Sequence, residues 1–194
     1  MTSRKEDVYQ LEVVLRDLEP PIWRRLQVPG SLTLDRLHLV LQQAMGWTDS
    51  HLHEFVIAGR RYGVPDPERG LMVILPEQRV RLRDVAPAES GRFLYRYDFG
   101  DDWKHEVLVE RILAAGEGGG SPVCLRGERR CPPEDCGGVP GYEEFLAAIR
   151  DAGHPRHHEL LEWVGGAFDP EAFDLTRVNR ALAGPHRPRR GTRR

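Results

Sequence analysis

The three cysteines of the chain, Cys124, Cys131 and Cys136, lie within thirteen residues of one another. They occupy a segment rich in proline and glycine, which neither a helix nor a strand is expected to organise. Thiols gathered in this way are typical of a metal site or a redox centre. Their spacing, C-x6-C-x4-C, differs from the paired C-x2-C motifs of a zinc ribbon. Small, buried, reduced side chains are therefore the alternative interpretation.

A tetrahedral zinc site needs a fourth ligand besides three thiolates. His105 begins the strand that leaves a predicted hairpin, and His53 begins an earlier strand. Either imidazole, or that of His51, can complete the site if the hairpin packs beneath the cysteines; for His105 a surface or interface histidine is the alternative. His51 shares a strand face with His53, because alternate residues of a strand point the same way. The predicted zinc ligands are Cys124, Cys131, Cys136, His105 and His53.

Carboxylates cluster in two segments that are expected to be loops. Asp98, Asp101 and Asp102 surround the turn of the predicted hairpin, and Glu134 and Asp135 lie between the last two cysteines. If the two loops meet, these residues form an acidic pocket suited to a hard cation or to general acid–base chemistry. Ordinary turn chemistry is the alternative, since aspartate readily hydrogen-bonds its own backbone.

Other chemistry has weaker support in the sequence. Cys131 or Cys136 with His105 as base would make a cysteine nucleophile, but nothing places these groups within reach of one another. The chain has no phosphate-binding loop, dinucleotide fingerprint, G-x-S-x-G or H-E-x-x-H motif. Aromatic residues on the predicted strands can stack on bases if Arg24 and Arg25 supply charge; core packing is the alternative.

Length and composition indicate one globular domain. The chain has 194 residues, of which 40% are hydrophobic and 30% charged, enough to bury a core. No apolar run approaches the length of a membrane span, and residues 1–7 are polar, unlike a signal peptide. We therefore expect no membrane association and a cytoplasmic protein, where thiols stay reduced. The odd number of cysteines agrees with that expectation.

The charge is distributed unevenly. Five arginines lie in residues 187–194, and without them 23 basic residues face 30 acidic ones. An acidic body is unlike most nucleic-acid-binding domains, which present a basic face. We expect residues 184–194 to be a disordered, Arg-rich tail; contact with phosphate is the alternative.

Hydrophobic periodicity predicts strands first and helices last. Apolar residues alternate over residues 8–16 and 22–28, which predicts an antiparallel pair of strands. Residues 33–45 follow a helical period that Gly46 ends. Residues 93–109 alternate through a Gly-Asp-Asp turn and predict a hairpin. The fold class is α+β: a single domain, residues 1–183, with a mainly antiparallel sheet and a helical C-terminal third.

Three segments together resemble the plasmid pRiA4b ORF-3-like family: residues 21–25 (PIWRR), 97–105 (YDFGDDWKH) and 131–142 (CPPEDCGGVPGY). The resemblance extends from about Tyr9 to about Leu182. It implies a small α+β protein without an established activity, of a kind that travels on plasmids or insertion elements. A resolvase label found on some members is not supported, because Ser3 lies in a polar terminus and the body is acidic.

Three hypotheses about function follow. The leading one is a non-enzymatic binding or interaction module of a mobile element, stabilised by one structural metal in the Cys124–Cys136 loop, with zinc as the expected ion. The second is a metal-dependent hydrolase that uses the acidic loops and His105. The third is a nucleic-acid-binding accessory protein. The partner is a protein or a nucleic acid, and a homo-oligomer is compatible with each hypothesis.

Overall fold

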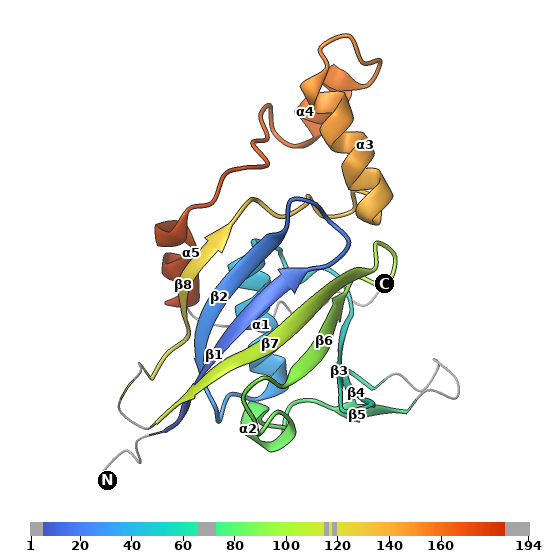
Figure 1. The fold of residues 1–194 in the computed structure, drawn as a ribbon. Coiled ribbons are helices and arrows are strands. Elements are labelled where there is room, and N and C mark those ends of the chain that lie inside the picture. Colours follow the sequence, from blue (N-terminus) through green and yellow to red (C-terminus); the bar gives the residue numbers. More distant parts are fainter. Residues whose placement is uncertain (1–5, 66–72, 115–116, 118–119, 185–194) are drawn as a thin grey trace.

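The computed structural model describes residues 6–65, 73–114, 117 and 120–184 (Figure 1). The strands are β1 (Val8–Leu15), β2 (Ile22–Pro29), β3 (His53–Ile57), β4 (Arg60–Gly63), β5 (Ile74–Pro76), β6 (Arg92–Tyr97), β7 (Trp103–Leu113) and β8 (Val123–Glu128). The helices are α1 (Leu34–Met45), α2 (Leu82–Val85), α3 (Gly138–Arg150), α4 (His157–Trp163) and α5 (Leu175–Leu182).

All strands of the described residues belong to one sheet, in the order β5-β4-β3-β6-β7-β1-β2-β8. Neighbouring strands are antiparallel except for β4 and β5, which are parallel. The α+β class and the mainly antiparallel sheet are therefore confirmed. Helices are not confined to the C-terminal third, because α1 and α2 lie between strands. Residues 185–194 of the predicted tail lie outside the described residues.

The predicted hairpins form where the alternation of apolar residues is clearest. β1 pairs with β2 from Val8↔Pro29 to Leu15↔Ile22, so the apolar side chains of both strands share the buried face. β6 pairs with β7 from Arg92↔Leu108 to Tyr97↔Trp103, which places residues 98–102 in the connecting turn. This turn lies at the upper end of the sheet in Figure 1.

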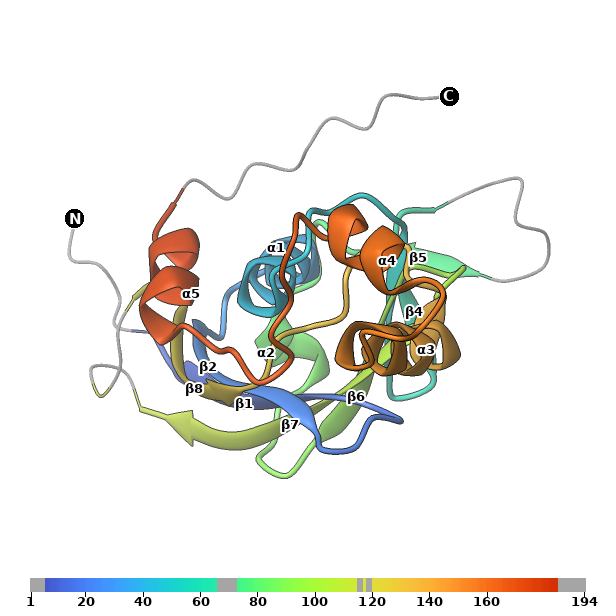
Figure 2. The same cartoon turned by 90° about the horizontal axis from the view of Figure 1, so that it is seen from above.

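The helices lie on one side of the sheet (Figure 2). α1 covers the centre of that face with the apolar stripe that its sequence predicts, including Leu34, Leu37 and Leu41. It ends at Gly46, whose left-handed φ of 97° suits glycine and whose N–H donates to the Gln42 carbonyl. The hydrophobic core therefore lies between α1 and the sheet. No described helix has the length and apolar character needed to span a bilayer.

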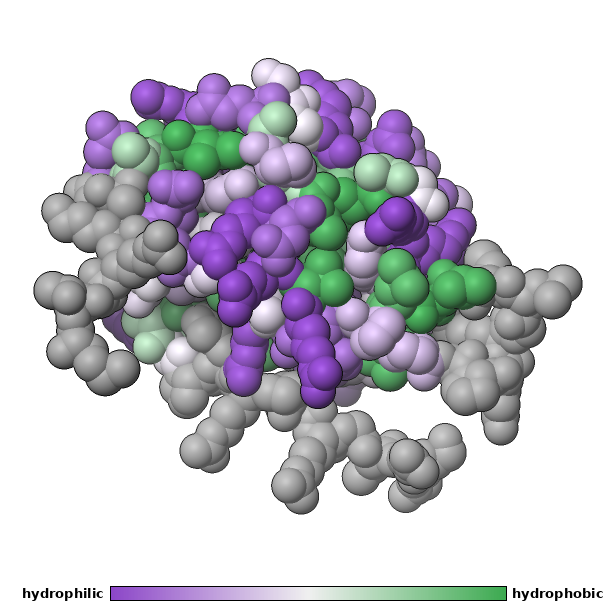
Figure 3. Space-filling model, turned by 90° about the horizontal axis from the view of Figure 1, so that it is seen from below, coloured by the Kyte–Doolittle hydropathy of each residue, from purple (hydrophilic) through white to green (hydrophobic). Residues whose placement is uncertain are grey.

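The opposite face of the sheet is polar. The Arg25 guanidinium donates two hydrogen bonds of 2.7 Å to the carboxylate of Glu110, and it also lies 3.3 Å from Glu12. Arg24 points to the other face and is buried. The arginines considered for nucleic-acid binding are thus engaged within the protein. Seen from below, at the end opposite the β6–β7 turn, hydrophilic and apolar side chains intermingle (Figure 3).

Candidate functional site

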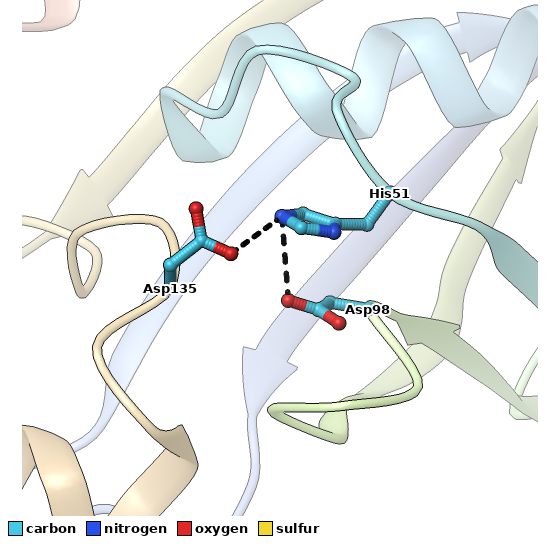
Figure 4. Close-up of side chains that lie close together, drawn as sticks. All are labelled: His51, Asp98 and Asp135. Atoms are coloured by element: carbon cyan, nitrogen blue, oxygen red, sulfur yellow. Dashed lines mark ion pairs between the residues drawn. The ribbon is translucent and has the colours of Figure 1, made fainter. Parts of the chain in front are cut away.

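Three loops converge at the upper end of the sheet: the turn between β6 and β7, the segment before β3, and residues 129–137, here called the β8–α3 loop. They bring the imidazole of His51 against carboxylates from the other two loops (Figure 4). His51 Nε2 lies 3.0 Å from Asp135 Oδ1, 3.5 Å from Asp98 Oδ2 and 3.9 Å from Glu134 Oε2. Within the described residues, His51, Asp98 and Asp135 form the single group of at least three His, Cys, Asp or Glu residues whose ligand atoms lie within 4.8 Å of one another.

Asp98 is fixed by its own turn. Its backbone has a left-handed φ of 54°, which aspartate tolerates better than most residues. One carboxylate oxygen, Oδ1, accepts a hydrogen bond of 2.9 Å from the Gly100 N–H. The backbone N–H of Asp98 donates to the Leu52 carbonyl, next to His51. These contacts leave Oδ2, the second carboxylate oxygen, facing His51.

Glu134 joins the β8–α3 loop to the segment before β3. Its Oε1 accepts hydrogen bonds from the Thr48 N–H at 2.8 Å and from the Tyr97 hydroxyl at 3.1 Å. The Tyr97 hydroxyl in turn accepts from the Ser50 N–H. Burial and the nearby Glu134 carboxylate raise the pKa of Tyr97, so the phenol stays protonated and donates. Glu134 therefore holds its loop in place beside His51.

Asp101 anchors the start of α3. Its Oδ2 accepts a hydrogen bond from the Gly137 N–H at 3.1 Å, and Gly137 is the N-cap residue of α3. The next residue, Gly138, packs so closely that an added Cβ would lie 2.5 Å from the Asp101 carbonyl oxygen. Its φ of 68° is also in the left-handed region. The β6–β7 turn and the β8–α3 loop are therefore in direct contact, with glycine required between them.

Gly138→Ala is expected to push the two loops apart and to lower the free energy of unfolding by about 2–3 kcal/mol, from backbone strain and from the clash. Gly165→Ala is the matched control, because Gly165 also has a positive φ, 87°, but nothing lies within 4 Å of the added Cβ. Urea denaturation of both variants measures the difference. Equal losses would contradict a close contact between the loops.

Asp102 does not join the group around His51. It forms ion pairs with Arg96 and with Lys104, the latter at 2.7 Å. Burial disfavours its charged form, but the hydrogen bonds from Lys104 and Arg96 prevail and hold its pKa below the usual value. Of the five predicted acidic residues, Asp98, Glu134 and Asp135 surround His51, Asp101 supports the loop, and Asp102 stabilises the turn.

The structure does not bring the five predicted zinc ligands together. Cys124 lies in β8, where its Sγ is 3.4 Å from the Arg126 carbonyl oxygen. Cys131 is buried beside Arg24, and Cys136 Sγ is 4.0 Å from the Gly138 carbonyl oxygen. Close spacing in the sequence failed as a guide, because the backbone turns between these residues and sends each thiol to a different neighbour.

Burial also keeps the thiols protonated. It raises the pKa of Cys131 to about 11. Burial, together with the carboxylate of Asp101, raises the pKa of Cys136 to about 12. Metal binding and nucleophilic attack both need the thiolate. Burial therefore disfavours the thiolate form of Cys131 and Cys136 in this environment.

The two predicted histidine ligands have other partners. His53 Nε2 lies 2.9 Å from the buried carboxylate of Glu77, and its ring stacks on His38 with centroids 3.4 Å apart. His105 is fully buried in β7, where its Nδ1 lies 3.2 Å from the Tyr95 carbonyl oxygen. His51 was considered with His53 and His105 as the fourth zinc ligand, but it was not among the five predicted ligands. β3 pairs with β6 so that His53 lies opposite Tyr97, and the residues just before β3 therefore lie beside the β6–β7 turn. There the imidazole of His51 meets the carboxylate of Asp98.

Comparisons with known proteins agree with this architecture. The family model of the plasmid pRiA4b ORF-3-like proteins matches residues 7–177. The chain belongs to the plasmid pRiA4b ORF-3-like family. A relative described as uncharacterized protein y4hQ, from Sinorhizobium fredii (strain NBRC 101917 / NGR234), is 43% identical over 176 residues, which are 90% of each chain. A crystal structure of a protein of unknown function, MM3350 from Methanosarcina mazei Go1, has a TM-score of 0.78 and 38% identity, covering 89% of this chain and 98% of that one.

The segments that carry the resemblance to the pRiA4b ORF-3-like family meet in space. Residues 97–105 provide Asp98 and the turn, and residues 131–142 provide Glu134 and Asp135. Residues 21–25 provide Arg24, whose guanidinium donates to the Glu128 and Arg129 carbonyls at the start of the β8–α3 loop. The most recognisable parts of the sequence therefore build and support one region of this family member.

A pocket of about 690 Å³ adjoins this region and is lined in part by Glu134 and Asp135. Its walls come from the end of α1, the β8–α3 loop, the segment between α4 and α5, and α5. Asp135 is exposed, with 69% of its side-chain surface accessible, and His51 is partly exposed. The group around His51 is thus open to solvent on the side of Asp135 and borders a cavity of ligand size.

Proposed function

We propose that this protein binds a divalent cation through His51, Asp98 and Asp135, with Glu134 near enough to contribute. One observation carries the proposal: a nitrogen and two carboxylate oxygens from three separate loops lie within 4.8 Å of one another. An imidazole nitrogen combined with carboxylate oxygens suits Zn²⁺ or Mn²⁺, whereas a site for Mg²⁺ or Ca²⁺ usually has oxygen ligands alone. The zinc predicted for the cysteines is thus proposed for a different set of ligands.

The surroundings of His51 Nε2 support this proposal. The atom is buried and makes no hydrogen bond in the described residues, although three carboxylate oxygens lie within 4 Å of it. Buried polar atoms normally have hydrogen-bond partners, and a nitrogen whose contacts with three carboxylate oxygens lack hydrogen-bond geometry is suited to sharing a cation with them. A cation held between the imidazole and the carboxylates satisfies all of them together.

The openness of the group favours a functional cation over a purely structural one. A structural zinc site has four protein ligands and is closed, while a catalytic site keeps a position for water or substrate. Here Asp135 is exposed and lines the pocket of about 690 Å³. The second candidate function is therefore a metal-dependent hydrolase, in which the cation lowers the pKa of a bound water and makes it a nucleophile. A binding module that recognises its ligand through the cation needs the same open position.

Cation binding is testable with protein that carries no histidine tag and has been stripped with EDTA. Calorimetric titration with Zn²⁺ and Mn²⁺ is expected to show one site, and His51→Ala or Asp98→Asn is expected to weaken binding at least about tenfold. His158→Ala, at an exposed position in α4, is the matched control and should bind as the wild type does. No binding by the wild type, or unchanged binding by His51→Ala, would refute the proposal.

Two further measurements separate the alternatives. Cys131→Ser is expected to keep the full stoichiometry of cation binding. A lower stoichiometry in this variant would indicate that the cysteines bind the metal. Cation-dependent hydrolysis of p-nitrophenyl phosphate or p-nitrophenyl acetate, abolished by His51→Ala, would favour the hydrolase. Binding without turnover of these esters would favour the binding module.

A further inference from the structure

The pocket of about 690 Å³ has features that the cation site does not explain. It lies on the helical side of the sheet, where α1, α4 and α5 are all found (Figure 2). Its volume falls within the range of about 300–1,000 Å³ that is usual for pockets binding small molecules. The nature of its ligand can be inferred from the charges and rings that line it.

Arg24 is a buried cation in the wall of this pocket. Its side chain is 2% exposed, and its guanidinium donates to four backbone carbonyls: those of Ala44, Trp23, Glu128 and Arg129. None of the carboxylates in the described ranges forms an ion pair with it. A buried charge is normally balanced by an opposite one. The positive charge of Arg24 is thus left without an anion.

Two more arginines line the pocket at exposed positions, Arg130 in the β8–α3 loop and Arg177 in the first turn of α5. The guanidinium carbon of Arg130 lies over the Phe168 ring, 4.4 Å from its centre. An arginine stacked on a ring in this way can still donate from the N–H groups at its edge. Neither arginine forms an ion pair with a carboxylate of the part of the chain that the structure describes. A guanidinium fork of this kind suits phosphate or carboxylate oxygens.

The carboxylates of the pocket already have partners. Asp174 accepts a hydrogen bond from the Arg177 backbone N–H and caps α5. Glu134 is bonded by Thr48 and Tyr97, and Asp135 faces His51. The pocket thus carries three arginines and three carboxylates. The carboxylate oxygens have contacts within the protein and Arg24 donates to four carbonyls, so Arg130 and Arg177 are the groups that keep guanidinium donors for an anion.

Aromatic rings supply the remaining surface. Phe173 lies under Arg24, with the guanidinium carbon 4.5 Å from the ring centre, and Trp47 is held in place by a hydrogen bond from its Nε1 to the Pro132 carbonyl. Trp163, at the end of α4, lines the same pocket and keeps 47% of its surface exposed. Flat apolar faces next to guanidinium groups are suited to a planar ring that carries an anionic group.

We infer that this pocket binds a small phosphorylated compound with a planar ring, of the size and chemistry of a mononucleotide. Arg130 and Arg177 contact the phosphate, and the ring packs against the exposed side chain of Trp163. The inference deepens the proposed function, because Glu134 and Asp135 place the cation at one edge of the same pocket. Phosphate recognition by the arginines, however, needs no cation.

The test is a calorimetric titration with AMP, adenosine and inorganic phosphate in buffer containing EDTA. AMP is expected to bind, adenosine and phosphate at least tenfold more weakly. Arg177→Gln and Arg130→Gln should each weaken AMP binding at least fivefold. Arg180→Gln is the matched control: it removes an exposed arginine of the same helix that does not line the pocket, and it should bind AMP as the wild type does.

Each outcome decides one part of the inference. Failure of AMP to bind at millimolar concentration, or unchanged binding by the Arg130→Gln/Arg177→Gln double variant, would overturn it. Phosphate binding as tight as AMP binding would show that the planar ring contributes nothing to recognition and would overturn that part of the inference. His51→Ala should still bind AMP in EDTA. A wild-type protein that binds AMP but no cation would overturn the proposed function and leave this inference standing.

Discussion

Arg24→Met is expected to lower the free energy of unfolding by about 3–5 kcal/mol, because it leaves several buried acceptors without a donor. The guanidinium holds the carbonyl oxygens of Ala44, Trp23, Glu128 and Arg129 at 2.7–2.9 Å. These carbonyls belong to α1, β2, β8 and the β8–α3 loop. Methionine fills a similar volume but donates no hydrogen bond. The substitution therefore removes the hydrogen bonds that join α1 to the β8–α3 loop.

Arg25→Met is the matched control, since it makes the same substitution at the next residue on the opposite face of β2. Arg25 is partly exposed and pairs with Glu110 and Glu12, and such pairs contribute at most about 1 kcal/mol. Arg24→Lys should fall between the two, because a single ammonium group cannot reach all four carbonyls. Urea denaturation followed by tryptophan fluorescence measures all three. Equal losses for Arg24→Met and Arg25→Met would contradict the role assigned to the buried guanidinium.

The parts of the fold that could be predicted are those set by neighbouring residues. The alternation of apolar side chains placed β1, β2, β6 and β7, because each buries one face against α1. The helical period and Gly46 placed α1 to within a residue. The order of strands in the sheet has no such local signature. β1, the first strand, lies between β7 and β2, and that pairing depends on packing between distant segments.

The candidate site depends on the same distant packing, which explains what was missed. The sequence indicated that the turn with Asp98 and the loop with Glu134 and Asp135 would form an acidic pocket if they met, and the structure places them side by side. It could not indicate that His51, rather than His53 or His105, completes the group. That choice follows from the register of β3 on β6, which aligns His53 with Tyr97.

The cysteines show the opposite case, in which a strong local pattern does not gather its side chains at one point of the structure. Their density in the sequence suggested a shared ligand, yet Cys124 belongs to β8 and the other two thiols turn toward different neighbours. Arg24 was considered for a charged surface because it lies beside Trp23. Arg24 instead points to the buried face of the sheet and its neighbour Arg25 to the polar face, because successive residues of a strand point to opposite sides.

His105 is expected to make the protein lose stability in acid. Burial lowers the pKa of this histidine to about 3, against 6.5 for the ordinary side chain. Its Nδ1–H donates to the Tyr95 carbonyl, and its Nε2 is buried without a hydrogen-bond partner among the described residues. The unfolded chain therefore takes up a proton as the pH falls below about 6.5, while the folded protein does not until about pH 3. The stability contributed by the neutral imidazole is complete above the unfolded pKa and is lost as the pH falls.

Between pH 7 and pH 5 this histidine alone should remove about 2 kcal/mol from the free energy of unfolding. His105→Asn keeps a donor near the position of Nδ1 but cannot take up the proton, so its stability should fall less steeply with acid over that interval, whatever its value at pH 7. Burial also lowers the pKa of His38. The loss of stability in acid that follows is the same in the wild type and in His105→Asn, so it cancels when the two profiles are compared. His158→Asn, at an exposed position, should follow the wild-type profile. Parallel profiles for His105→Asn and the wild type, from urea denaturation at each pH, would show that the buried imidazole does accept a proton in the folded protein.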